Sequence, residues 1–200
     1  VASAAGDVEA VLDALGIESA AHVGASGGGP HALACAALLP HRTTAVVSIA
    51  GLAPFVDGFD WATGMASDAA LRAATRGREA RAAVDEGDVD AFTPADWAAL
   101  EGAWADLGRD VGRAMQTGGL DGLVDDDVAY ATPWGFDPTT ITAPVLLVHG
   151  GRDRVVPASH SQWLLEHLPT AELWLRPREG HVSVLGAVPV TLDWVVAQQT

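Results

Sequence analysis

A serine with glycines on both sides lies near the start of the chain, in residues 22–30, His-Val-Gly-Ala-Ser-Gly-Gly-Gly-Pro. A short apolar run precedes it, and an Ala/Leu-rich stretch with helical character, residues 31–39, follows it. This order predicts a strand, a sharp turn with Ser26 at its apex, and a helix. Glycine has no Cβ, and we expect a side chain at Gly24 or Gly28 to collide where strand and helix approach each other. The segment therefore restricts the chain to folds in which a strand passes directly into a helix.

The pattern Gly24-x-Ser26-x-Gly28 fits a nucleophile elbow, in which a strained turn lifts a serine into a pocket. We expect the backbone of Ser26 to occupy a sparsely allowed region, a strain that accompanies functional sites. Taken alone, the pattern also fits a flexible Gly/Ser loop or a phosphate-binding turn. The P-loop requires a lysine, and the sequence contains none. Evidence from the rest of the sequence is needed to distinguish a nucleophile elbow from a flexible loop.

Predicted strands and helices alternate in the first and last parts of the chain. Apolar runs predict strands over residues 20–23, 44–50, 143–150 and 171–175. Apolar residues at helical spacing predict helices over residues 6–15, 31–39, 159–168 and 189–198. Strands that are buried on both faces have uninterrupted apolar runs, so we expect an α/β fold with a parallel sheet of about four strands.

The middle of the chain, residues 55–137, is acidic, alanine-rich and helical in pattern, with no strand-like run. Thr93 as N-cap and Pro94 at the first helical position open one of its predicted helices. Helices are expected over residues 67–86, 93–106, 111–116 and 120–130. We therefore predict three parts: a core part (1–54), an inserted helical cap (55–137) and a second core part (138–200).

Three polar residues follow predicted strands in a suggestive order. A serine nucleophile needs a base to take its proton, and that base needs a carboxylate to fix its tautomer. In parallel α/β sheets, functional groups gather beyond the carboxyl ends of the strands. Ser26, Asp153 and His181 each follow a strand, so we expect them on one rim of the sheet. Asp57 is an alternative acid, but it lies several residues into the approach to the cap, and Asp153 is favoured.

The chain resembles the α/β-hydrolase fold family, whose members carry nucleophile, acid and histidine in this order. Residues 24–30 resemble the elbow, residues 144–157 resemble the acid strand and its loop, and Gly180 and His181 resemble the histidine loop. The resemblance covers essentially the whole chain. It implies a capped serine hydrolase similar to esterases and proline iminopeptidases.

The resemblance also implies a role for each residue. Ser26 is the expected nucleophile, His181 the general base and then acid, Asp153 its orienting carboxylate, and the Gly27 N–H an oxyanion-hole donor. Family members have further strands ahead of the elbow and a loop that supplies a second donor, and here one helix precedes the elbow strand. We therefore expect the C-terminal two-thirds of a longer protein, with the elbow strand exposed at a sheet edge.

Large side chains of the insertion could line a substrate pocket, together with a histidine next to the elbow. The candidate substrate-binding residues are His31, Trp61, Met65, Trp104 and Trp134. The other histidines show no metal-ligand spacing, so we expect no metal and no cofactor. These histidines are expected to be structural or surface residues: His22, His41, His149, His160 and His167.

Composition excludes several classes of partner. The net charge of −15 argues against binding to a nucleic-acid backbone. No apolar run approaches the length of a membrane-spanning helix. The one cysteine, Cys35, is expected to be a packed core thiol. We therefore expect a soluble, cytoplasmic protein that acts on a small-molecule substrate; its oligomeric state is left open.

The leading functional hypothesis is a serine hydrolase that cleaves a carboxylic ester, a lactone or a small amide through an acyl-enzyme. One alternative keeps the same three residues but transfers the acyl group to peroxide or an alcohol, as a cofactor-free perhydrolase or an acyltransferase does. A second alternative is a non-catalytic, ligand-binding chain with a hydrolase-like fold.

Overall fold

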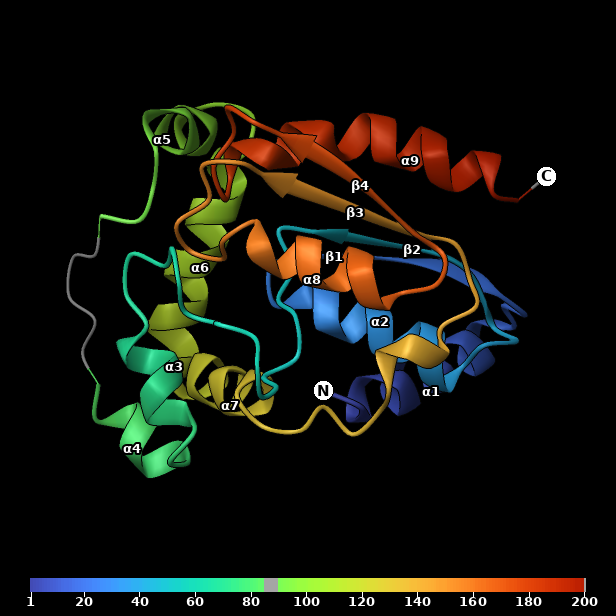
Figure 1. The fold of residues 1–200 in the computed structure, drawn as a ribbon, viewed down its shortest axis with the longest axis horizontal. Coiled ribbons are helices and arrows are strands. Elements are labelled where there is room, and N and C mark those ends of the chain that lie inside the picture. Colours follow the sequence, from blue (N-terminus) through green and yellow to red (C-terminus); the bar gives the residue numbers. More distant parts are fainter. Residues whose placement is uncertain (85–89, 200) are drawn as a thin grey trace.

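A four-stranded sheet forms the centre of the protein in the computed structural model, which describes residues 1–84 and 90–199 (Figure 1). The strands are adjacent in the order β1-β2-β3-β4, and each neighbouring pair is parallel. The prediction of an α/β fold with about four parallel strands is confirmed. Strand β1 lies at one edge of the described sheet, as expected. The strands are β1 (Ala20–Ala25), β2 (Thr43–Ile49), β3 (Val145–Gly150) and β4 (Ala171–Arg176).

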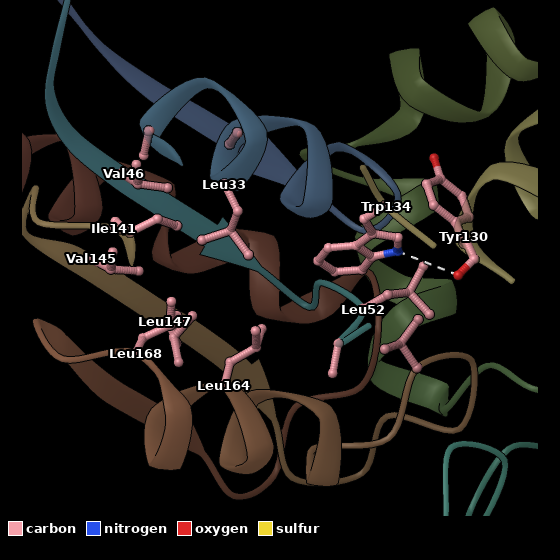
Figure 2. Close-up of a cluster of buried hydrophobic side chains, with 14 of the residues drawn as sticks. Leu33, Val46, Leu52, Tyr130, Trp134, Ile141, Val145, Leu147, Leu164 and Leu168 are labelled. Carbon is pink, nitrogen blue, oxygen red and sulfur yellow. Dashed lines mark hydrogen bonds between the residues drawn. The ribbon is translucent and has the colours of Figure 1, made fainter. Parts of the chain in front are cut away.

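Helices from the two ends of the chain cover the sheet. On one face, helices α2 (Gly28–Leu38) and α8 (Ser159–His167) bury Leu33 and Leu164 against Val46 and Leu147 (Figure 2). On the other face, α9 (Val188–Ala197) and the 3-10 turn η2 (Ser183–Ala187) pack on alternate residues of β2 and β3. Each fully buried Leu, Ile or Val contributes about 1.5–3 kcal/mol, so these two layers account for much of the hydrophobic stabilisation. Helix α1 (Ser3–Leu15) packs on α2.

In the described part of the chain, five helices lie in sequence between β2 and β3, and Figure 1 shows them gathered beyond the carboxyl ends of the strands. They are α3 (Ala69–Ala74), α4 (Arg78–Ala82), α5 (Pro94–Glu101), α6 (Ala105–Gly118) and α7 (Asp121–Tyr130). The short turn η1 (Pro138–Thr140) leads from the insertion back to β3. Thr93 caps α5 as predicted, since its side chain accepts a hydrogen bond from the Asp96 N–H in a capping box.

The prediction of one helix over residues 67–86 is wrong. The segment forms α3 and α4, separated at Gly77, whose φ of +100° is incompatible with a continuous helix; residues 85 and 86 lie outside the described residues. The helix that begins at Pro94 ends at Glu101 rather than near residue 106, and residues 111–116 belong to the longer α6. Within the described residues, no helix combines the length and apolar character needed to cross a membrane.

Candidate active site

The turn between β1 and α2 holds Ser26 in the left-handed region, with a φ of +51°. The expected strain at this serine is therefore present. Two backbone hydrogen bonds fix the turn: the Ser26 N–H donates to the Ile49 carbonyl at 2.8 Å, and the Gly29 N–H donates to the Ser26 carbonyl at 2.9 Å. The strained backbone is thus held from both the neighbouring strand and the first turn of the helix.

The glycines around Ser26 differ in whether the structure leaves room for a side chain. A Cβ on Gly24 would lie 2.0 Å from the Gly28 carbonyl oxygen, so strand and helix touch at this position as predicted. The same expectation is wrong for Gly28, where an added Cβ would meet nothing within 4 Å. The second close approach occurs one residue later, because a Cβ on Gly29 would lie 2.4 Å from Ser48 Oγ.

Ser26, His181 and Asp153 form one continuous hydrogen-bonded chain. His181 Nε2 lies 3.0 Å from Ser26 Oγ, and His181 Nδ1 lies 2.7 Å from Asp153 Oδ2. An ionised carboxylate has no proton to donate, so Nδ1 carries the hydrogen and Nε2 is left to accept the serine proton. The sequence-predicted nucleophile, base and acid are brought together on one rim of the sheet, whereas Asp57 lies in an exposed turn.

Hydrogen bonds in the loop after β3 stabilise the ionised form of Asp153. Its Oδ1 accepts the N–H groups of Val155 and Val156 at 2.9 Å each. Burial opposes ionisation, but the close approach of His149 and the hydrogen bond from His181 outweigh it and lower the pKa of Asp153 to about 2. Asp153 is therefore a fixed anion at neutral pH, suited to holding an imidazolium.

Two buried histidines support this rim from behind. His149 Nδ1 lies 2.6 Å from Ser161 Oγ, and its Nε2 lies 2.8 Å from the Val156 carbonyl. His160 accepts the Ala53 N–H at Nδ1 and donates from Nε2 to the Trp61 carbonyl. Burial lowers the pKa of His160 to about 4, so its ring is neutral. Both rings fix loops, in agreement with the structural role expected for them.

The sequence patterns missed one residue that holds the histidine loop. Asp96 in α5 is fully buried, and its Oδ1 accepts the N–H groups of Val182 and Ser183 at 2.8 Å each. Its Oδ2 accepts from both the N–H and the hydroxyl of Thr93. These bonds outweigh burial and lower the pKa of Asp96. The capping-box pattern identifies Asp96 as a helix-start residue, but nothing local in the sequence indicates its contact with residues 86 and 87 positions away.

A cavity of about 430 Å³ lies beside Ser26 and Gly27. The core side contributes Leu52, Arg154, Val155 and Val156, and the insertion side contributes Ser67, Ala70, Leu71, Ala91, Leu123, Asp126, Asp127 and Tyr130. Aliphatic side chains thus form half of the wall, and Ser67, Asp126, Asp127 and Arg154 add polar and charged groups. Asp127 is held by Arg81, whose Nε donates to it at 2.5 Å.

The five candidate substrate-binding residues do not line this cavity. Trp61 donates its indole N–H to the Ala53 carbonyl at 2.7 Å and borders a second cavity, of about 330 Å³. Trp134 and Met65 pack in the core between sheet and insertion, and Trp104 packs against the opposite face. His31 lies behind Tyr130, with 5.9 Å between ring centroids. Large apolar side chains are needed to join the insertion to the sheet, and this packing takes them away from the cavity beside Ser26.

Two features of Gly27 bear on the site: its backbone N–H and its contact with Tyr130. Among the described residues its N–H has no hydrogen-bond acceptor. A Cβ at this position would lie 2.2 Å from the Tyr130 hydroxyl oxygen, so the insertion contacts the elbow directly. The Gly27 amide also lies at the amino end of α2, where the helix dipole favours negative charge. In the part of the chain that the structure describes, no group of three or more His, Cys, Asp or Glu residues is arranged to hold a metal ion.

A family model described as "alpha/beta hydrolase fold" matches residues 1–187. The chain belongs to this alpha/beta hydrolase family. The resemblance inferred from the elbow, acid loop and histidine loop is therefore confirmed. The enol-lactonase from Burkholderia xenovorans LB400 is similar in structure to this hydrolase chain, with a TM-score of 0.65 and 22% identity over 98% of this chain and 71% of that one.

Two relatives are named as enzymes. The pimeloyl-[acyl-carrier protein] methyl ester esterase of Nitrosomonas europaea is 44% identical over 45 residues, 22% of this chain and 18% of the relative. A protein of Caulobacter sp. (strain K31), named as the carbamate hydrolase RutD, is 28% identical over 192 residues, 90% of this chain. The matched part spans 65% of that second relative's length.

Proposed function

We propose that this alpha/beta hydrolase chain carries the catalytic groups of a serine hydrolase that cleaves a carboxylic ester, a lactone or a small amide. The observation that carries the proposal is the hydrogen-bonded chain from Asp153 through His181 to Ser26. This chain ends at a serine in a strained turn that borders a cavity. A serine with a merely structural role has no need of either the strain or the ionised partner behind its base.

The reaction follows from the proton positions. Ser26 Oγ forms a bond to the substrate carbonyl carbon while its proton passes to His181 Nε2, and the carbonyl π electrons move onto oxygen. The Gly27 N–H donates to this oxygen, and Asp153 stabilises the imidazolium. When the tetrahedral intermediate collapses, the C–O or C–N bond of the leaving group breaks, and the leaving group takes the proton from His181. Water then repeats the sequence on the acyl-enzyme and regenerates Ser26.

The cavity supports a small acyl group with an aliphatic surface. Leu52, Leu71 and Leu123, with Val155 and Val156, give it an apolar wall, and a volume of about 430 Å³ is within the range of small-molecule sites. The names of the methyl ester esterase and the carbamate hydrolase both describe attack on an acyl carbonyl carbon. These likenesses favour hydrolysis of a carbonyl compound over the non-catalytic alternative.

Labelling with a fluorophosphonate tests the proposal, because this reagent phosphonylates activated serines. The full chain and the matched control Ser19→Ala, which alters an exposed serine, should both be labelled. Ser26→Ala should lose labelling while keeping its circular dichroism spectrum. Labelling that survives Ser26→Ala, or a folded wild-type chain that never becomes labelled, would contradict the proposal.

A further inference from the structure

The contact between Gly27 and Tyr130 brings a hydroxyl group from the insertion to the elbow. Tyr130 is the last residue of α7, and it borders the same cavity as Ser26 and Gly27. An ideal Cβ on Gly27 would lie 2.2 Å from the hydroxyl oxygen and 2.8 Å from the ring carbon that carries it. The hydroxyl therefore occupies the space that a side chain at residue 27 would fill. This close approach explains why glycine follows the serine.

The Tyr130 side chain is otherwise set firmly in place. The residue is 6% exposed and belongs to the core cluster that includes Trp134, whose indole N–H donates to the Tyr130 carbonyl at 3.3 Å. Figure 2 shows the ring at the border of this cluster, with its hydroxyl directed away from the packed leucines. A donor group held this rigidly loses little entropy when it binds a ligand.

Within residues 1–84 and 90–199, the Tyr130 hydroxyl has no hydrogen-bond partner. The hydroxyl oxygen is not fully enclosed by protein atoms, and Tyr130 lines the cavity, so the hydroxyl can donate a hydrogen bond to a polar group there. Burial and the nearby carboxylates of Asp126 and Asp127 raise the pKa of Tyr130. The phenol therefore keeps its proton at neutral pH and can serve as a donor.

We propose that the Tyr130 hydroxyl is a catalytic residue, a side-chain donor to the oxyanion in addition to the Gly27 N–H. The proposal rests on the proposed serine-hydrolase function. During attack by Ser26 the carbonyl oxygen gains the π electron pair and becomes negative. Tyr130 donates a hydrogen bond to that oxygen and retains its proton throughout, while the Ser26 proton travels through His181. The contact of α7 with the elbow thereby adds a group from the insertion to the catalytic groups.

The Tyr130→Phe variant tests this role, because it removes the hydroxyl and keeps the ring. With p-nitrophenyl acetate, kcat should fall about 100-fold, since the loss of one oxyanion donor has this effect, while KM should change less than about 3-fold. The rate of fluorophosphonate labelling should fall in parallel, because phosphonylation develops charge on the corresponding oxygen. The matched control Thr132→Val removes a hydroxyl two residues away, which donates to the Val128 carbonyl, and should retain wild-type kcat.

The outcomes separate this proposal from the proposed function. If Ser26 is labelled and Tyr130→Phe keeps kcat within about 3-fold of wild type, Tyr130 only packs, and the oxyanion proposal is overturned. If wild-type Ser26 is never labelled, the serine-hydrolase function itself fails.

A second experiment decides the matter if Tyr130→Phe does not fold. Tyr130 is the one tyrosine in the chain, so biosynthetic incorporation of a fluorotyrosine changes this position alone. Fluorination lowers the pKa of the phenol with little change in size. The kcat of the fluorinated protein should fall at the alkaline pH where its phenol ionises, while wild-type kcat stays constant there. Identical pH profiles for the two proteins would overturn the proposal.

Discussion

Removal of the Asp96 carboxylate should loosen the histidine loop and weaken the whole fold. In Asp96→Ala the backbone N–H groups of Thr93, Val182 and Ser183 lose their acceptor, and the carboxylate that they share is fully buried. An unsatisfied buried N–H costs about 1–3 kcal/mol, and water that enters the vacated space recovers part of the sum. We therefore expect the free energy of unfolding to fall by about 3 kcal/mol.

The Asp96→Asn variant should lose less of the free energy of unfolding than Asp96→Ala. Its remaining carbonyl oxygen can still accept from Val182 and Ser183, but its amide group opposes the N–H of Thr93. We expect a loss of about 1–2 kcal/mol. The substitution Glu101→Gln alters an exposed carboxylate of the same helix, α5, and serves as the matched control with no expected change.

The histidine loop links this stability effect to the proposed chemistry. His181 precedes Val182 directly, so release of the Val182 and Ser183 amides should displace the imidazole from Ser26. A displacement of about 1 Å can cost up to about 100-fold in rate. Urea denaturation gives the free energy, and fluorophosphonate labelling below the unfolding transition gives the rate. If Asp96→Ala unfolds as wild type does and labels at the wild-type rate, the coupling of α5 to His181 is refuted.

Three further predictions follow from single contacts. Gly24→Ala should destabilise the protein by more than about 2 kcal/mol, because the added Cβ would collide with the Gly28 carbonyl. Gly28→Ala should change thermal stability little, because an added Cβ there meets nothing. Equal shifts in Tm for the two variants would contradict this prediction. The pKa of Asp153 is lowered to about 2 in the folded state, from about 4 in the unfolded state. Its contribution to the free energy of unfolding, about 2 kcal/mol, is therefore present above the unfolded pKa and is lost as the pH falls towards 2. Asp153→Asn should remove this part of the acid dependence measured by urea unfolding. The phenolate absorbance of Tyr130 near 295 nm should appear only above the usual pKa of about 10 while the protein stays folded, and ionisation at or below that value would contradict the buried setting of this side chain.

Local patterns predict the parts of the fold that local physics decides. Buried parallel strands such as residues 145–150 have continuous apolar runs, and Thr93-Pro94 marks a helix start in the sequence itself. The order of Ser26, Asp153 and His181 predicts a shared rim because parallel strands end on the same side of a sheet. Their hydrogen bonds agree with that prediction.

The sequence patterns did not predict features that depend on tertiary packing. Asp96 reaches the histidine loop across 86 residues, and no periodicity reports such a contact. Trp61 and Trp134 have the size expected of pocket residues, yet the junction between insertion and sheet needs that apolar volume. The cavity is lined instead by smaller side chains and by Tyr130, whose position depends on the missing Cβ of Gly27.

Trapping of the acyl-enzyme tests the central claim most directly. The full chain is mixed with p-nitrophenyl acetate, quenched in acid within the first turnover, digested and mapped by mass spectrometry. The account predicts one acetyl group on Ser26, absent from Ser26→Ala and strongly reduced in His181→Ala. An acetyl group on another residue, or release of p-nitrophenol from the folded chain without any acetylated Ser26, would contradict it.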